Sequence, residues 1–148
     1  VLTLVGEGEK RSELETLIAH TGVGGQIEMI GSVTDVDAWY RTSAFLAFPS
    51  LWEGFPNALV EAFSQGLPAI GLEGTAGVNE LLRHGETGLL VPADEIAFAQ
   101  AMKAMIDDVE FRRKSGRKAR ESVLQFEPEA IFAQWASLFT ELAGKPHS

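Results

Sequence analysis

The sequence predicts an α/β fold, a Rossmann-like three-layer α/β/α sandwich with helices on both faces of a parallel sheet. Short apolar and β-branched runs alternate with stretches of helical periodicity, which is typical of βαβ units. Right-handed crossovers between parallel strands place the connecting helices on the faces of the sheet. With 148 residues, of which 45% are hydrophobic, the chain is expected to form a single domain over 1–148 with its own core.

Five apolar runs, each closed by glycine or proline, are expected to be strands. They cover residues 2–6, 27–31, 44–48, 67–71 and 87–91. Helical patterns lie between these strands and after them. They cover residues 12–20, 35–40, 57–65, 77–83, 94–106, 109–124 and 128–142. Gly66 ends the helix that begins at Asn57, and C-terminal helices alone are expected over 94–143.

Composition and charge narrow the classes of partner. The chain has no cysteine, which excludes disulfides and thiolate chemistry and fits the cytoplasm. A net charge of -9 disfavours nucleic acid as a partner, so an anionic ligand needs a local device such as a helix N-terminus. No apolar run is long enough to span a membrane, and residues 1–11 lack signal-peptide features. The missing initiator methionine and the start within a strand indicate a piece of a longer protein.

Ligands of parallel α/β sheets bind at the loops that follow the carboxyl ends of the strands. Here these loops are residues 6–10, 31–34, 49–56, 71–76 and 92–94. The third loop leads into a helix that starts near Asn57, and the unpaired N–H groups and positive dipole end of a helix start favour an anion. Gly54 lets the backbone approach a ligand closely, and Asn57 is expected either to cap the helix or to direct its amide at the ligand.

Two glutamates flank this predicted anion site. Glu53 lies in the loop, and Glu61 lies one helical turn after Asn57 on the same face, with seven residues between the two glutamates. Carboxylates accept paired hydrogen bonds from neighbouring hydroxyl groups. A helix start between two carboxylates therefore suits a ligand that joins sugar, phosphate and sugar, as a nucleotide sugar does.

The same segment carries a family resemblance. Residues 53–62, EGFPNALVEA, resemble the E-x7-E motif of retaining GT-B glycosyltransferases, the glycosyl transferases group 1 of family 4. Further segments similar to that family follow in the same order: VGEG at 5–8, IGSV at 30–33, AGVNEL at 76–81 and GETGLLVP at 85–92. The resemblance covers nearly the whole chain and implies the C-terminal, donor-binding domain of the GT-B fold without its first β-α unit.

The resemblance also implies roles for individual residues. Glu61 is expected to bind the ribose hydroxyls of the donor nucleotide, Glu53 to contact the donor sugar as the catalytic carboxylate, and Val33 to face the base. The backbone of residues 55–58 is expected to approach the sugar and the diphosphate. The full set of implied donor-binding residues is Gly6, Val33, Glu53, Gly54, Phe55, Pro56, Asn57, Ala58 and Glu61. No metal or other cofactor is expected.

The implied activity is transfer of a hexosyl or N-acetylhexosaminyl group from a UDP- or GDP-sugar, with retention and by front-face displacement. The expected acceptor is a saccharide or lipid-linked saccharide of a bacterial surface polysaccharide, such as capsule or lipopolysaccharide. In the family, an N-terminal acceptor domain and an Arg/Lys pair for the diphosphate precede this segment, so the chain alone is expected to be inactive. The expected location is the cytoplasm, with peripheral attachment to the inner membrane through the acceptor domain.

Other functions stay open at this point. The main alternatives are a non-catalytic or degenerate nucleotide-binding module and a GT-B sugar-nucleotide epimerase. A retaining glycosidase also uses two carboxylates, but rarely seven residues apart around a helix start. NAD binding is disfavoured because Arg11 stands where a dinucleotide-binding fingerprint has its third glycine.

Several polar side chains near the predicted loops have two interpretations. Lys10 and Arg11 are either phosphate ligands or solvated residues of a first helical turn. Asn79 and Glu80 either contact the donor or cap a helix. Trp52 either stacks on the sugar or base or packs against the protein.

The remaining histidines and basic residues are expected at the surface. The histidines show no metal-ligand spacing and are His20, His84 and His147. The basic residues between 112 and 120 are expected on a solvated helix rather than on a membrane-binding one, because little apolar face accompanies them.

Overall fold

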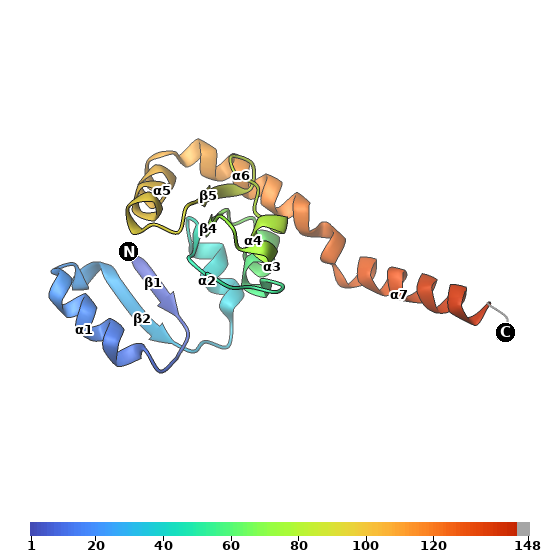
Figure 1. Cartoon of the computed structure of the whole chain (residues 1–148), viewed down its shortest axis with the longest axis horizontal. Helices are drawn as coiled ribbons and strands as arrows, with labels where there is room; N and C mark the ends of the chain where they lie inside the picture. The colour runs from blue at the N-terminus through green and yellow to red at the C-terminus, as the bar shows by residue number, and fades with distance from the viewer. Residues whose placement is uncertain (145–148) are drawn as a thin grey trace. The chain divides into compact units, whose positions relative to one another are not determined.

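The computed structural model describes residues 1–144 and divides into two compact units (Figure 1). The first unit is Val1–Val36, and the second is Asp37–Ser148, described as far as residue 144. Both units contain parallel strands connected through helices, so the predicted α/β class is confirmed.

The first unit is a β-α-β segment. Its elements are β1 (Leu2–Val5), α1 (Arg11–Thr21), the short 3-10 helix η1 (Gly24–Gln26) and β2 (Ile27–Gly31). β1 pairs in parallel with β2, from Leu2 opposite Ile27 to Val5 opposite Gly31. Most side chains of the two strands are half-buried or exposed, and no residue of α1 is buried. The core of the chain therefore lies in the second unit.

The second unit is built on a three-stranded parallel sheet of order β3-β4-β5. The strands are Leu46–Phe48, Ala69–Leu72 and Gly88–Val91. All four residues of the central strand β4 are buried, which explains the continuous apolar sequence of this strand. The carboxyl ends of the three strands lie at one edge of the sheet, because the strands run in parallel.

Helices cover both faces of this sheet and give the three layers. The helices that follow β2 are α2 (Val36–Thr42), α3 (Asn57–Ser64), α4 (Ala76–Leu81), α5 (Glu95–Asp107), α6 (Val109–Val123), the short η2 (Leu124–Phe126) and α7 (Pro128–Ala143). One apolar cluster joins Ala69 of β4 to α3, α4 and α6, whereas the next residue, Ile70, joins a second cluster with α5. Adjacent strand residues point to opposite faces, so the two clusters lie on opposite sides of the sheet.

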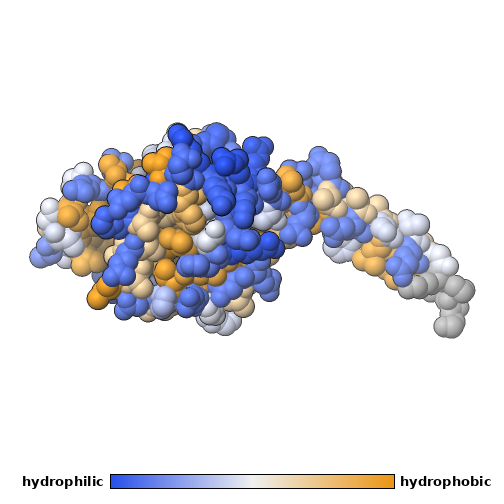
Figure 2. All heavy atoms as spheres, turned by 90° about the horizontal axis from the view of Figure 1, so that it is seen from above, coloured by the Kyte–Doolittle hydropathy of each residue, from blue (hydrophilic) through white to orange (hydrophobic). Residues whose placement is uncertain are grey.

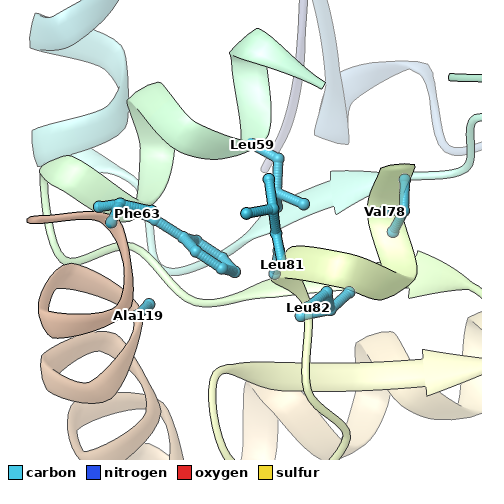
Figure 3. Close-up of a cluster of buried hydrophobic side chains, with 8 residues drawn as sticks. Leu59, Phe63, Val78, Leu81, Leu82 and Ala119 are labelled. Carbon is cyan, nitrogen blue, oxygen red and sulfur yellow. The ribbon is translucent and has the colours of Figure 1, made fainter. Parts of the chain in front are cut away.

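Figure 3 shows the first cluster, in which side chains of α3, α4 and α6 converge. Leu59 and Phe63 of α3 and Leu82, next to α4, are each 0% exposed. Complete burial of such a side chain contributes roughly 1.5–3 kcal/mol. The helix that the sequence places after the third loop is therefore fixed to the sheet by its apolar face.

Glycine and proline set the ends of the elements, as the sequence predicts. Gly66 ends α3 with a left-handed φ of 74°, and its N–H donates to the carbonyl of Phe63 at 2.9 Å while Leu67 donates to Ala62 at 3.0 Å. β4 begins at Ala69 rather than at residue 67, because Pro68 has no N–H for the strand ladder. The other predicted strands and helices are present, with ends shifted by at most two residues.

Helix α7 differs from the other α-helices of the second unit because none of its residues is buried. Its exposed apolar side chains, which we call the α7 stripe, are Phe132, Trp135, Leu138, Phe139 and Leu142. Apolar residues of α7 are visible as orange spheres in Figure 2. Within residues 1–144, no helix is both long enough and apolar enough to cross a membrane.

Candidate functional site

The loop between β3 and α3 turns sharply into the helix at Pro56. This proline is fully buried, and its φ of -81° and ψ of 82° form an inverse γ-turn in which the Asn57 N–H donates to the Phe55 carbonyl at 3.0 Å. Pro56 occupies the N-cap position without a side-chain cap. The prediction that Asn57 caps the helix is therefore wrong, because Asn57 is already the first helical residue and its side chain is exposed.

The start of α3 leaves one backbone donor without an acceptor. The N–H groups of Leu59 and Val60 donate to the Pro56 carbonyl at 3.0 and 3.2 Å. The N–H of Ala58 has no acceptor among residues 1–144. Gly54, in the preceding loop, is exposed, and a Cβ on it would meet nothing within 4 Å. The helix start thus has the open backbone and free N–H that an anion uses.

Glu53 is half-buried and is held by the loop that carries it. The Ser50 hydroxyl lies 2.8 Å from Oε1 of Glu53 and 3.1 Å from the carbonyl oxygen of Trp52. One hydroxyl proton serves one acceptor at a time, and the shorter bond to the charged carboxylate is the stronger. The Ser50 carbonyl in turn accepts a hydrogen bond from the buried Thr75 hydroxyl at 3.1 Å. A chain of two bonds therefore connects Glu53 to the loop after β4.

Glu61 projects from α3 and is exposed, but one of its oxygens has a buried partner. The hydroxyl of Tyr40, on α2, donates to Oε2 of Glu61 at 3.4 Å. Tyr40 is only 9% exposed. Burial and, next, the adjacent charge of Glu61 raise the pKa of the Tyr40 phenol to about 12, so the phenol remains a donor at neutral pH.

The loop after β4 lies directly against the loop that carries the glutamates. A Cβ on Gly77, at the start of α4, would lie 2.0 Å from the Gly54 carbonyl oxygen, so only glycine permits this approach. Together with the bond from Thr75 to Ser50, this contact brings two of the predicted ligand loops together. Both loops follow carboxyl ends of strands, which is the edge at which parallel α/β sheets bind ligands.

Asn79 stabilises the loop after β4 rather than facing a ligand. Its Nδ2 donates to the Leu72 carbonyl at 2.9 Å, and its Oδ1 accepts from the Gly74 N–H at 2.8 Å. Both ends of the amide are therefore used within the loop, which favours the structural interpretation of Asn79. Glu80, the next residue, is exposed.

Gly6 and Val33 belong to the first unit. Gly6 has a φ of 131°, which a residue with a side chain rarely adopts, and its N–H donates to the Gly31 carbonyl at 2.8 Å. Val33 is half-buried in the segment after β2. The predicted donor contacts of Gly6 and Val33 would therefore come from the first unit, whereas Glu53 and Glu61 lie in the second.

The basic residues at the start of α1 are paired within the first unit. Arg11 contacts Glu7 and donates to Glu15 at 2.8 Å and to the Met29 carbonyl at 3.2 Å. Lys10 pairs with Glu13 at 2.5 Å. A phosphate would have to compete with these carboxylates, which favours the structural interpretation of both residues.

Trp52 does not pack against the protein, contrary to one of its two predicted interpretations. It is 91% exposed, and the preceding Leu51 is 71% exposed. The reason is that these two residues form the outer part of the surface loop, while Ser50 and Pro56 lie against the protein beside them. Stacking of Trp52 on a sugar or base stays a prediction.

The histidines within residues 1–144 lie at the surface, as predicted. His20 and His84 are both exposed. Nδ1 of His20 lies 2.6 Å from the Thr16 carbonyl oxygen, and Nδ1 of His84 lies 2.9 Å from the Leu90 carbonyl oxygen. His147 lies outside the described residues. Among residues 1–144, no group of three or more His, Cys, Asp or Glu side chains is arranged to hold a metal ion. Independence from metal stays a prediction.

The basic helix, α6, is solvated on one side only. Its small residues Ser115, Gly116 and Ala119 are buried, and a Cβ on Gly116 would lie 2.1 Å from the Gly66 carbonyl oxygen. Arg112 donates to the Met105 and Ile106 carbonyls at the end of α5. The basic residues therefore lie on a helix whose opposite side packs on the core of the second unit.

Sequence reasoning missed three side chains of the candidate site. Ser50 and Tyr40 donate to the two glutamates, and Thr75 fixes the backbone at Ser50. The position of Ser50 two residues after the end of β3, at the carboxyl edge, was a usable signal. Tyr40 and Thr75 act across 21 and 25 residues of sequence, which local patterns do not reveal.

Comparison with known proteins gives this site a context. A family model described as Glycosyl transferases group 1 matches residues 1–108. The chain is 36% identical over 146 residues to an exopolysaccharide phosphotransferase of Streptomyces coelicolor, covering 97% of this chain and 16% of that protein. It is 30% identical over 147 residues to the lipopolysaccharide core biosynthesis glycosyltransferase LpsE of Rhizobium meliloti, covering 98% of this chain and 42% of that one. The chain thus spans less than half the length of both relatives.

Solved structures support the fold. Sucrose-phosphate synthase from Thermosynechococcus elongatus matches with a TM-score of 0.85 and 29% identity, over 95% of this chain and 38% of that chain. The HepE protein of Anabaena, in complex with UDP, matches with a TM-score of 0.85 and 23% identity, over 94% of this chain and 40% of that chain. These likenesses confirm the Rossmann-like fold of GT-B type.

Proposed function

Since the chain belongs to the glycosyl transferases group 1 family, we propose that it is the donor-binding part of a retaining glycosyltransferase of the GT-B fold. The reaction is transfer of a hexosyl or N-acetylhexosaminyl group from a UDP-sugar, or a GDP-sugar, to a saccharide or lipid-linked acceptor. The setting is synthesis of a bacterial surface polysaccharide at the cytoplasmic side of the inner membrane. One named relative is an exopolysaccharide phosphotransferase and the other a glycosyltransferase of lipopolysaccharide core biosynthesis, which supports this setting.

One observation carries the proposal: two carboxylates flank an open helix start, and each is held by a hydroxyl donor. Ser50 holds Glu53 and Tyr40 holds Glu61, while the Ala58 N–H between them has no acceptor among the described residues. A diphosphate suits the N–H and dipole of the helix start. Hydroxyl groups on either side of it suit the carboxylates.

The proposed roles follow from this order of groups. Glu61 accepts hydrogen bonds from the ribose hydroxyls, and the backbone at Ala58 binds the diphosphate. Glu53 accepts hydrogen bonds from the donor sugar and so fixes the position of its reactive carbon for transfer with retention. The HepE structure was determined with UDP, which supports UDP as the first nucleotide to test.

A further part of the proposal concerns the partner of this domain. The α7 stripe exposes five large apolar side chains, and Phe139 stacks on Trp135 with ring centroids 5.7 Å apart. Exposed apolar surfaces of this kind are typical of contacts with another protein domain or with a membrane. We assign it to the acceptor domain of the same parent chain.

The test is calorimetric titration of the chain with UDP, GDP and NAD, followed by UDP-glucose and UDP-N-acetylglucosamine. The expected result is binding of UDP or GDP, with a dissociation constant in the micromolar to millimolar range, and no binding of NAD. Absence of binding by both UDP and GDP, or binding of NAD alone, would contradict the proposal.

Two variants separate the carboxylates. Glu61→Ala is expected to weaken UDP and UDP-sugar alike by roughly 10- to 100-fold, the size of a lost hydrogen-bond pair to a charged group. Glu53→Ala is expected to weaken the UDP-sugar by a similar factor and to leave UDP nearly unchanged. Glu129→Ala, an exposed glutamate of α7, is the matched control and should change neither. Equal and negligible effects of Glu53→Ala and Glu61→Ala would refute the assigned roles.

A further inference from the structure

Tyr40 is the one buried side chain of α2, and its hydroxyl reaches a residue of another helix. The ring is 9% exposed, so the hydroxyl has little freedom to move, whereas Glu61 is exposed and has a long flexible side chain. Tyr40 donates to one of the two carboxylate oxygens of Glu61, Oε2. A fixed donor therefore holds one oxygen of a mobile carboxylate.

The consequence for binding is a matter of orientation. A carboxylate that receives two neighbouring hydroxyls must turn both of its oxygens towards them. An exposed glutamate loses on the order of 1.5–2 kcal/mol of rotamer freedom when it is fixed in such an orientation. Each carboxylate oxygen has two acceptor positions, so the bond from Tyr40 leaves room for a ligand on Oε2 as well as on Oε1. A side chain that is already held in place binds more tightly because less freedom is lost.

We propose that Tyr40 is a positioning residue, whose hydroxyl holds the Glu61 carboxylate in the orientation that receives the ribose hydroxyls of the donor nucleotide. The inference rests on the proposed function of Glu61 and adds a residue that does not touch the donor. The phenol stays protonated across the physiological range, because burial and the neighbouring Glu61 both raise its pKa.

The test compares the binding of UDP with that of a UDP analogue lacking both ribose hydroxyls, by calorimetry with the whole chain. Tyr40→Phe keeps the buried ring and removes only the hydroxyl. The expected result is about fivefold weaker binding of UDP, as for one hydrogen bond of modest strength, and unchanged binding of the analogue. Thr42→Val is the matched control, because its hydroxyl bonds to backbone carbonyls of the same helix; UDP binding should not change.

The double variant Tyr40→Phe/Glu61→Ala tests whether the two residues act as a unit. It is expected to bind UDP no more weakly than Glu61→Ala alone. Equal loss for UDP and the analogue, or the same fivefold loss in the Glu61→Ala background, would overturn the positioning role while leaving the proposed function intact. Unchanged UDP binding in Glu61→Ala would instead remove the proposed function.

A second measurement tests the contact without any nucleotide. Tyr40 is the only tyrosine of the chain, so the ultraviolet absorbance of tyrosinate reports its ionisation alone. Glu61→Gln is expected to lower the pKa of Tyr40 from about 12 without returning it to 10.0, because burial persists. An unchanged titration would overturn the inference, and circular dichroism at each pH verifies that the chain is still folded.

Discussion

The ring of Phe55 packs edge-on against the ring of Phe126, with centroids 5.3 Å apart and an angle of 75° between the planes. Phe55 lies in the loop that carries Glu53, and Phe126 belongs to η2 and packs against the main apolar cluster. Phe55 is 51% exposed, and its ring pair adds to the attachments that the loop makes through Pro56 and through the bond from Thr75 to Ser50. The loop before α3 is thereby connected to the segment that leads into α7.

Replacing Phe126 should loosen this loop. Phe126→Leu keeps apolar volume but removes the ring pair, which is worth about 0.5–1.5 kcal/mol. The backbone amides of Asn57, Leu59 and Val60, which donate to carbonyls of this loop, are therefore expected to exchange their hydrogens about two- to tenfold faster, as measured by mass spectrometry. Phe132→Leu, in the exposed stripe of α7, is the control and should leave these amides unchanged. Identical exchange in both variants would show that the ring pair does not restrain the loop.

Removal of the Ser50 hydroxyl should affect the donor sugar more than the nucleotide. Ser50→Ala removes the bond to Glu53 while leaving the Ser50 carbonyl that Thr75 contacts. Affinity for a UDP-sugar is expected to fall about three- to tenfold and affinity for UDP to stay within about twofold, by calorimetry. Ser137→Ala on α7 is the control. Equal losses for UDP and UDP-sugar would indicate a general disturbance of the loop and contradict the specific bond to Glu53.

Local sequence signals predicted the frame of the site better than its contacts. Gly66 correctly predicted the end of α3, because backbone freedom acts within a few residues, whereas β4 begins two residues later than predicted because Pro68 lacks an N–H donor. The bond from Tyr40 to Glu61 depends on packing of α2 beside α3, which no local pattern encodes. Trp52 shows the opposite difficulty: its size suggested packing as one interpretation, but its place at the outer part of the loop leaves it exposed.

Gly77→Ala should destabilise the second unit and disturb the site together. The added methyl group would lie 2.0 Å from the Gly54 carbonyl oxygen and 3.2 Å from Cδ of Pro56, so α4 or the loop must move. The expected loss of unfolding free energy is about 1–3 kcal/mol, measured by urea denaturation. Gly54→Ala is the stability control, because its Cβ would meet nothing within 4 Å. Equal stability of the two variants would show that the close approach does not restrict residue 77.

Tyr40 should make the stability of the fold depend on alkaline pH. Its folded pKa of about 12 lies above the ordinary 10.0, so the folded state keeps the phenolic proton after the unfolded state has lost it. The associated stability is fully present below pH 10.0 and is lost as the pH rises towards about 12. Burial together with the charges of Glu61 and Asp37 causes the shift, and its contribution is on the order of 2–3 kcal/mol.

The measurement is the free energy of unfolding by urea at several pH values, for the native chain and for Tyr40→Phe. Lysines titrate in the same range in both proteins, so the difference between the two curves isolates the phenol. The native chain is expected to lose its advantage over Tyr40→Phe as the pH rises from 10.0 to about 12. Parallel curves over this range would mean that Tyr40 ionises equally in the folded and unfolded chains, and that its hydroxyl is not held beside the Glu61 carboxylate.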